Sequence, residues 1–325
     1  MPAVAFASAL ALSVAVYSAP QALSPVAGGG RGGSSPGATG NSSGIPAADP
    51  TSAPTRTPGT DRNTARRERP TTTVRGGVTC TFPRTAAASA QARRIQDVVG
   101  PAAVRAGRHV AVGVEDLVTG TRCSLRGARR FDSASIVKVA VVAAAVRDAR
   151  LQRRSLTAQE RAWSRAAITV SDNDATSALW RRIGAGAGLK RFLAAAGMRR
   201  TVPGDGPRWG LTRVTADDQL VLLRHVSTHG VLTKAERAYI LGLMRSVTPS
   251  QRWGVPTGAP AGTTVGNKNG WLPRATAAWR VHSIGTATGP GRSYTAALLS
   301  DNDATFAAGI ARMDALARAV HRALS

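Results

Sequence analysis

A mostly apolar run spans residues 136–146, and Lys138 is its one charged side chain. The run is too short to cross a bilayer, which needs about 20 residues. Apolar residues on nearly every side of a helix of this length predict a helix buried in the core. Small polar residues lead into the run, and Ser135 lies one turn before Lys138, so the two side chains would share a helix face.

Lys138 has two interpretations. Its ammonium group could reach water from the end of a buried helix, which would make the lysine structural. Alternatively, burial near a helix N-terminus is costly for the ammonium, so the pKa falls and the neutral amine can act as a base. Ser135 would then be a nucleophile whose base lies on the same helix. The Ser-x-x-Lys pattern fixes two positions and does not decide between these interpretations by itself.

Periodic patterns on either side predict the surrounding elements. Before the apolar run, we expect a helix over residues 85–106, strands over residues 109–114 and 121–125, and a turn at Thr119-Gly120. After it, capping boxes or a close variant mark helix starts at Thr157 with Glu160, Thr233 with Glu236, and Thr215 with Asp218. Further helical patterns cover residues 179–184, 189–197 and 217–229.

Beyond Pro260 the pattern changes to strands. These are expected over residues 263–268, 276–286 and 293–300, followed by a helix over residues 304–324. The resulting fold class is α+β: one antiparallel sheet flanked by the terminal helices, with an all-helical subdomain from about residue 135 to 250. A site is expected in the cleft between the two parts.

The N-terminal region differs in composition from the rest. Residues 1–27 are mostly apolar and resemble the hydrophobic part of a secretory signal peptide, although no Lys or Arg precedes Arg31. Residues 28–78 are rich in Gly, Pro, Ser and Thr, which predicts a disordered linker. The folded domain is therefore expected over residues 79–325, in a protein that is secreted or otherwise extracytoplasmic.

Cys80 and Cys123 are the only cysteines. In an exported chain such a pair predicts one disulfide, whereas in a cytosolic protein the two would be buried free thiols. The signal-like start favours the disulfide.

The net charge of +25 comes almost entirely from arginine. It is consistent with a solvated basic surface, or with binding to nucleic acid or to an anionic cell-envelope polymer. Because no Lys/Arg cluster is interleaved with aromatic residues, we do not expect a nucleic-acid partner. We expect a monomer that acts on a small-molecule substrate without a metal or another cofactor.

Two further motifs follow the Ser135–Lys138 pair. Ser171-Asp172-Asn173 comes after the helix that begins at Thr157, and Lys268-Asn269-Gly270 ends the first strand of the C-terminal block. The order Ser-x-x-Lys, Ser-Asp-Asn, Lys-x-Gly resembles penicillin-binding proteins and class A β-lactamases. The resemblance extends over residues 79–325 and includes the flanking segments 171–180 and 265–273.

This resemblance implies a role for each motif residue. Ser135 would attack a carbonyl carbon to form an acyl-enzyme, with Lys138 as its base. Ser171 would relay a proton to the leaving nitrogen, and Asn173 would hold Lys138 and the substrate amide. Lys268 would supply positive charge facing the substrate carboxylate.

The second half of the Lys268 motif would complete the site. The backbone N–H groups of Ser135 and Trp271 would form the oxyanion hole, next to Gly270. Asn269 stands where the family usually has a threonine that contacts the substrate carboxylate, and its amide could donate there instead.

A second departure from the family is the absence of its deacylating glutamate. None of the glutamates in the sequence lies between Asn173 and Thr215, where the loop that carries it belongs. Asp205 could replace it, but a Pro-Gly-Asp-Gly-Pro context favours a turn aspartate. The hexapeptide Ser-Asp-Asn-Asp-Ala-Thr recurs at residues 300–305, where we expect a turn with helix-capping residues and no catalytic role.

Together these features predict an exported serine hydrolase that is acylated by β-lactams or related amides and esters and deacylates slowly. One alternative is a D-alanyl-D-alanine peptidase or peptidoglycan hydrolase that uses the same residues. Another is a non-catalytic domain that holds cell-wall polymer or peptide in a disused cleft.

Overall fold

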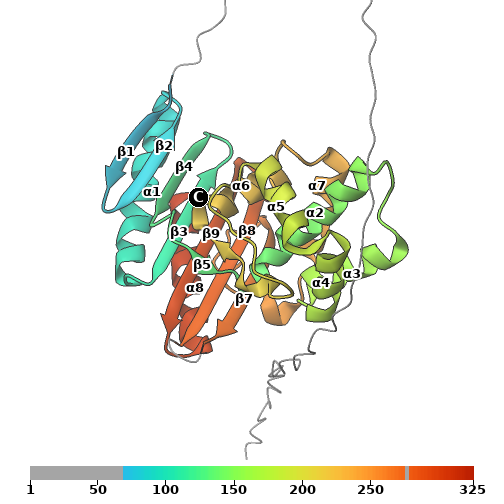
Figure 1. The fold of residues 1–325 in the computed structure, drawn as a ribbon. Coiled ribbons are helices and arrows are strands. Elements are labelled where there is room, and N and C mark those ends of the chain that lie inside the picture. Colours follow the sequence, from blue (N-terminus) through green and yellow to red (C-terminus); the bar gives the residue numbers. More distant parts are fainter. Residues whose placement is uncertain (1–68, 275–277) are drawn as a thin grey trace, which may run out of the picture. The chain divides into compact units, whose positions relative to one another are not determined.

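A computed structural model of the chain describes residues 69–274 and 278–325, which belong to one compact unit, Thr64–Ser325. The expected signal peptide, and the expected linker up to residue 68, lie outside the described residues. Nine strands are found (Figure 1): β1 Thr71–Arg75, β2 Val78–Phe82, β3 Val110–Asp116, β4 Thr121–Leu125, β5 Phe131–Asp132, β6 Arg213–Val214, β7 Thr264–Pro273, β8 Trp279–Gly289 and β9 Arg292–Asp303.

The described residues also form eight α-helices and three short 3₁₀ helices. The α-helices are α1 Ala86–Arg105, α2 Val137–Leu151, α3 Ala158–Thr169, α4 Asn173–Arg182, α5 Ala185–Ala196, α6 Ala216–Ser227, α7 Lys234–Arg245 and α8 Phe306–Ala323. The 3₁₀ helices are η1 Ala134–Ile136, η2 Trp209–Leu211 and η3 Pro249–Gln251. Full capping boxes start α3 at Thr157 and α7 at Thr233, as the sequence predicts.

Seven strands form one antiparallel sheet in the order β1-β2-β4-β3-β9-β8-β7. Alternate side chains of its central strands point to opposite faces. On β9, Leu298 packs in the core that α1 and α8 cover, whereas Ala297 and Leu299 pack in the core that α6 covers. Figure 1 shows α8 along the sheet and the group α2–α7 beside it. This arrangement confirms the expected α+β fold with an antiparallel sheet, terminal helices and a helical subdomain.

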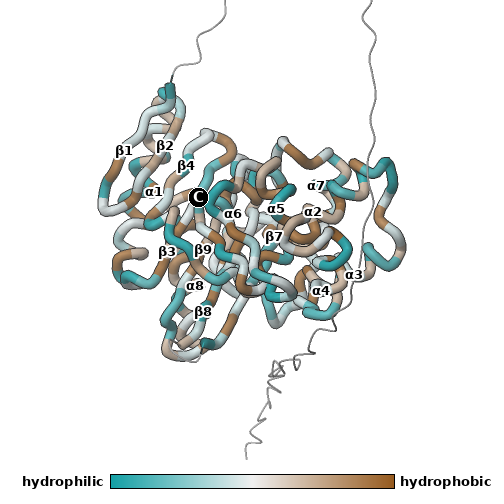
Figure 2. Tube along the Cα trace, viewed as in Figure 1, coloured by the Kyte–Doolittle hydropathy of each residue, from teal (hydrophilic) through white to brown (hydrophobic). Residues whose placement is uncertain are grey.

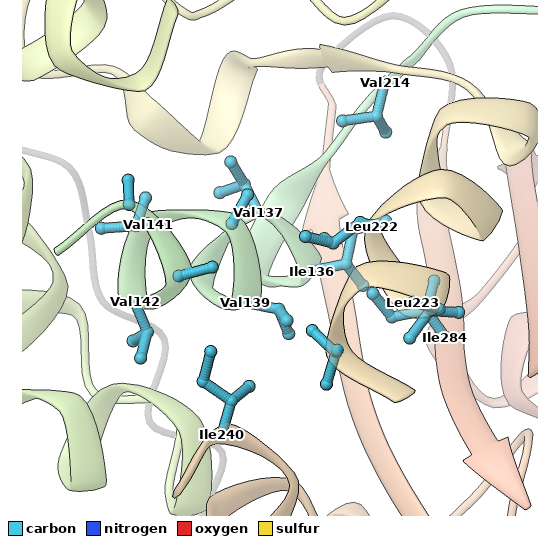
Figure 3. Packing of buried hydrophobic residues seen from close by; sticks show 14 of the residues in the cluster. Ile136, Val137, Val139, Val141, Val142, Val214, Leu222, Leu223, Ile240 and Ile284 are labelled. Atoms are coloured by element: carbon cyan, nitrogen blue, oxygen red, sulfur yellow. The ribbon is translucent and has the colours of Figure 1, made fainter. Parts of the chain in front are cut away.

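Helix α2 is the centre of the helical subdomain. Every residue from Val137 to Ala145 is buried, which agrees with a run that is apolar on nearly every side. Figure 3 shows Val139 and Val142 on the side of the helix nearer Ile240 of α7 and Val137 and Val141 on its opposite side, in a core that also includes Leu222 and Leu223 of α6. The hydropathy colouring in Figure 2 marks the same apolar helix among its more polar neighbours. The N-terminal end of α2 is thereby fixed against the sheet by packing.

Three sequence expectations need correction. The strand Thr71–Arg75 pairs with β2, so the ordered domain begins before residue 79 and the expected linker is too long at its C-terminal end. Threonine-rich polar strands are hard to distinguish from a linker because neither buries an apolar face. Helix α4 starts at Asn173 rather than near residue 179, because Asp172 caps it. Strand β7 continues to Pro273, well beyond Lys268.

The disulfide between Cys80 and Cys123 is present, which confirms that prediction. It joins β2 to β4 at positions that are paired in the sheet. Within the described part of the chain, no helix is long and apolar enough to span a membrane.

Candidate active site

Ser135 lies in the short helix η1, directly before α2, and is half-buried. The preceding residue, Ala134, has a left-handed backbone with φ 46°. Such a conformation costs on the order of 1–3 kcal/mol in a non-glycine residue and is maintained only where surrounding contacts enforce it. One of these contacts comes from His282 of β8, whose buried Nε2 lies 2.9 Å from the carbonyl oxygen of Asp132. The nucleophile candidate is thus held on a strained segment that is tied to the sheet.

Gly270 of β7 makes the closest approach between the sheet and this segment. A Cβ atom at Gly270 would lie 2.8 Å from the backbone nitrogen of Ser135 and 2.9 Å from that of Ile136. These separations are too short for any side chain, so the third position of the Lys-x-Gly motif must be glycine. The contact places β7 against the start of α2.

The Lys138 side chain is fully buried, and its Nζ lies within hydrogen-bond distance of four oxygen atoms, more than it has protons to donate. These are the backbone oxygens of Ser171 (2.5 Å) and Asp172 (3.2 Å), Ser171 Oγ (3.2 Å) and Asn173 Oδ1 (2.9 Å). Burial lowers the pKa of Lys138 to about 7, although the Asp172 carboxylate opposes this effect. The Lys138 ammonium group does not reach water at the end of the helix, so the interpretation of Lys138 as a structural, solvated lysine does not apply.

Ser171 lies in the turn between α3 and α4 with φ 62°, again a left-handed residue. Asp172 caps α4 by accepting a hydrogen bond from the Ala175 backbone nitrogen at 2.7 Å. This cap orients the turn so that Ser171 and Asn173 both face Lys138.

Lys268 enters from β7 and completes the cluster. Its fully buried Nζ lies 3.0 Å from Ser171 Oγ and 2.8 Å from the Asn269 carbonyl oxygen. Burial, together with the nearby charge of Lys138, lowers the pKa of Lys268 well below its ordinary value. The structure therefore brings Lys138, Ser171, Asn173 and Lys268 together, with Ser135 next to them through the Gly270 contact. In the described residues the Ser135 side chain forms no hydrogen bond, so a Ser135–Lys138 bond is not part of this state.

Asn269 does not lie where the resemblance would put it. Its Nδ2 donates to the backbone oxygens of Gln251 (2.9 Å) and Trp253 (3.0 Å), and the residue is fully buried. Strand alternation explains the correction, because Lys268 and Gly270 face the site and Asn269 faces the other way. The expectation that its amide meets a substrate carboxylate is wrong in this structure.

Trp271 is half-buried, and its ring packs 5.3 Å from that of Phe306 of α8. Its backbone nitrogen lies one residue after the Gly270 contact, at the same end of β7. Its participation in an oxyanion hole with the Ser135 nitrogen stays a prediction.

Trp209 is a site residue that the sequence did not reveal. Lys138 Nζ lies 4.9 Å from the centre of its ring, a cation–π distance, and the indole nitrogen donates to Ser177 Oγ at 3.1 Å. The residue belongs to η2, in a loop after α5 whose Gly and Pro content predicts only turns. A tryptophan in such a loop carries no periodic signal that would connect it to α2.

No described glutamate is free to act at Ser135. Glu115 is paired with Arg224, Glu160 with Arg154 and Arg182, and Glu236 with Arg150. The Asp205 side chain is 92% exposed and lies 3.8 Å from Arg208, and its backbone oxygen accepts a turn hydrogen bond from the same residue. Asp205 is thus a surface turn residue. Among residues 69–274 and 278–325, no group of three metal-ligating side chains is placed to hold a metal ion.

A nucleophilic hydroxyl, a buried amine of lowered pKa, a second hydroxyl and a second buried amine form a set of groups that can carry out acyl transfer. The fold and this site define a serine hydrolase. The sequence model of the beta-lactamase enzyme family matches residues 90–162 and 161–324. The chain belongs to this family.

Solved structures with the same fold include class A β-lactamases. A mutant of the last common ancestor of Gram-negative bacteria β-lactamase, bound to 5(6)-nitrobenzotriazole, is 24% identical over 70% of this chain and 97% of that one, with a TM-score of 0.59. A β-lactamase from Burkholderia vietnamiensis is 18% identical over 73% of this chain and 96% of its own, with a TM-score of 0.59. The protein L2 complexed with relebactam is 18% identical over 73% and 99%, with a TM-score of 0.60. No curated protein matches the chain.

Proposed function

We propose that this hydrolase is exported and that β-lactams or related amides and esters acylate it on Ser135, forming an acyl-enzyme that is lost slowly. The observation that carries the proposal is the convergence of Lys138 and Lys268 on the Ser171 hydroxyl, beside the strained segment that holds Ser135.

These positions support the following acylation step. The Ser135 Oγ attacks the carbonyl carbon while its proton moves to the neutral Lys138 amine. The C–N bond then breaks, and the leaving nitrogen takes a proton through the Ser171 hydroxyl, which Lys138 reprotonates. Lys268 supplies positive charge at the edge of β7 for an anionic group of the substrate. An ester would react in the same way, with an oxygen leaving group.

The positions and partners of the described carboxylates support slow deacylation. Hydrolysis of the acyl-enzyme needs a base that activates water, and a carboxylate is the usual group in class A β-lactamases. Each described glutamate is instead paired with an arginine, and Asp205 points into solvent. The side chain that lies against Lys138 from the loop after α5 is the Trp209 ring, which cannot activate water as a base.

Export is supported by the apolar N-terminal residues and by the Cys80–Cys123 disulfide, which needs an oxidising compartment.

Intact-mass spectrometry of the full chain during exposure to benzylpenicillin tests the proposal. We expect one adduct of the mass of the drug, which the Ser135→Ala variant does not form and which persists long after excess drug is removed. Absence of an adduct on folded protein would overturn the proposal and favour a non-catalytic binding domain. Rapid loss of the adduct, together with continuous hydrolysis of the drug, would contradict slow deacylation.

A separate assay distinguishes the cell-wall alternative. Release of D-alanine from a peptide ending in D-alanyl-D-alanine, abolished by Ser135→Ala, would identify a peptidase that uses the same nucleophile. We expect any release of D-alanine to be slower than acylation of the protein by a β-lactam.

A further inference from the structure

A groove of about 510 Å³ lies away from Ser135, between the end of α2 and the starts of α3 and α7. Its floor is apolar and includes Val146, Ala149 and Leu156, and Tyr239 stands at its side. Its charged lining is strongly basic, with a single acid, and consists of Arg150, Arg153, Arg154, Arg161 and Glu236.

Two of these arginines are paired with neighbouring carboxylates, although Glu160 is shared between Arg154 and Arg182. Arg150 Nε lies 2.8 Å from Glu236 Oε1 and donates to the Val231 carbonyl oxygen. Arg154 Nη1 lies 2.8 Å from Glu160 Oε2. Both glutamates also accept the cap hydrogen bonds of α7 and α3, so these two pairs are fixed by helix capping.

Arg153 and Arg161 are not neutralised. Both are exposed, and within the described part of the chain neither guanidinium group has an ion-pair or hydrogen-bond partner. Arg153 has a left-handed backbone, φ 53°, directly after the end of α2, and its nitrogen bonds to the Arg150 carbonyl oxygen. Arg153 in this turn and Arg161 in the first turn of α3 both line the groove.

The groove is remote from the hydrolase site. Lys138 lies at the start of α2 and Arg150 at its end, which corresponds to about 18 Å along the helix. A ligand in the groove would therefore contact neither Ser135 nor Lys268, and the groove is a site in its own right.

We infer that this groove binds a ligand that carries two or more phosphate groups, held by the unpaired guanidinium groups of Arg153 and Arg161. Guanidinium groups bind phosphate oxygens through paired N–H donors, and two such groups at one groove match two neighbouring phosphates better than one carboxylate. The apolar floor accommodates the carbon skeleton between the phosphates. Arg150 and Arg154 stay in their ion pairs with Glu236 and Glu160.

The net charge of +25 makes a charge-matched control variant necessary, because any polyanion will be attracted to this protein even without a specific site. Arg84 and Arg105 provide the matched pair. Both are exposed, and within residues 69–274 and 278–325 neither guanidinium group has an ion-pair or hydrogen-bond partner. They lie at the two ends of α1, which packs on the opposite face of the sheet from the core that contains α2 (Figure 1). Replacing them changes the net charge by the same amount as replacing Arg153 and Arg161.

The experiment is isothermal titration calorimetry of the full chain at 150 mM salt with two probes, inorganic pyrophosphate and poly(glycerol phosphate). We expect the double variant Arg153→Gln/Arg161→Gln to bind at least about tenfold more weakly than the wild type, a loss typical of charge-assisted hydrogen bonds. The double variant Arg84→Gln/Arg105→Gln should bind within about twofold of the wild type.

Binding of both probes would identify the phosphate groups themselves as the ligand, whereas binding of the polymer alone would identify a phosphodiester chain; each result supports the inference. Equal loss in the two double variants would overturn it, because the attraction would then be non-specific. Absence of binding by either probe to the wild type would also overturn it. Penicillin acylation of Ser135 in the groove variant is measured in parallel and should be unchanged, so the outcome is independent of the proposed function.

Discussion

Lys138 and Lys268 both reach the hydroxyl of Ser171, one from helix α2 at 3.2 Å and the other from strand β7 at 3.0 Å. A hydroxyl oxygen accepts two hydrogen bonds and still has its own proton to donate. With both acceptor positions occupied by amines, the Ser171 proton is left to be donated to another group, which in the proposed acylation is the leaving nitrogen of the substrate. Two buried ammonium groups at one oxygen would repel each other, so this arrangement favours a neutral amine.

The first prediction concerns the pH dependence of acylation. Burial lowers the pKa of Lys138 to about 7, and only the neutral amine can accept the Ser135 proton. The acylation rate constant should therefore rise as the pH increases through about 7, and fall about tenfold for each pH unit below it. Stopped-flow acylation by a chromogenic cephalosporin between pH 5 and 9 measures this profile. A profile that is flat over this range would exclude Lys138 as the base.

The second prediction uses Asp172, whose carboxylate raises the pKa of Lys138. Asp172→Asn removes the charge but keeps the α4 cap, because asparagine caps helices about as well as aspartate. The acylation profile should move to lower pH while the thermal stability stays nearly constant. The shift should shrink in 1 M salt, since Asp172 is exposed and salt screens its charge. A shift to higher pH would contradict the assignment.

The third prediction separates the Ser171 hydroxyl from its backbone. At φ 62° glycine is less strained than serine, so Ser171→Gly removes the proton relay without harming the turn. Acylation should slow by about 10²- to 10⁴-fold, the usual contribution of a proton-transfer group. The midpoint of urea unfolding should be unchanged or higher. Asn302→Gly, a left-handed residue in the other copy of the hexapeptide, should leave acylation unaffected.

The two copies of that hexapeptide show where the sequence was informative. At residues 171–176 the left-handed residue is Ser171 and the helix cap is Asp172, whereas at residues 300–305 they are Asn302 and Thr305. Identical residues thus form the turn that contacts Lys138 in one place and the end of a strand in the other. Only the order of the motifs along the chain distinguished them, because local propensity is the same in both.

The elements that could be predicted are those with a strong period or a capping signal. Helices α1, α2 and α8, the capping boxes at Thr157 and Thr233, and the Cys80–Cys123 bridge all belong to this class. Contacts formed by loops, such as Trp209 against Lys138, could not be predicted because they depend on how distant segments meet. The orientation of Asn269 could have been predicted, since Lys268 and Asn269 are neighbours on one strand and must face opposite sides.

The fourth prediction follows from that orientation. Asn269→Ala removes two buried hydrogen bonds, to the backbone oxygens of Gln251 and Trp253, which should cost about 1–3 kcal/mol of unfolding free energy. Because the side chain faces away from Ser135, the acylation rate constant should change by less than about threefold. Asn267→Ala, which removes one comparable bond to Gln251, is the matched variant and should cost less. A large loss of acylation with unchanged stability would instead indicate that Asn269 contacts the substrate.

The last prediction concerns the Cys80–Cys123 disulfide and its role in holding strands β1 and β2 in the sheet. Strand β2 pairs with β4 at only three positions, 79–81, and β1 is attached to the sheet through β2 alone. The Cys80–Cys123 bridge closes a separation of 43 residues, which is worth about 4 kcal/mol in the chain-entropy account. Replacing both cysteines by alanine should lower the unfolding free energy by an amount approaching this value, and hydrogen exchange should increase first in β1 and β2.

Acylation of Ser135 in the folded variant should persist, because none of the site residues lies on these strands. A reductant should destabilise the wild type and leave the double variant unchanged; equal effects on both would show that the bridge contributes nothing.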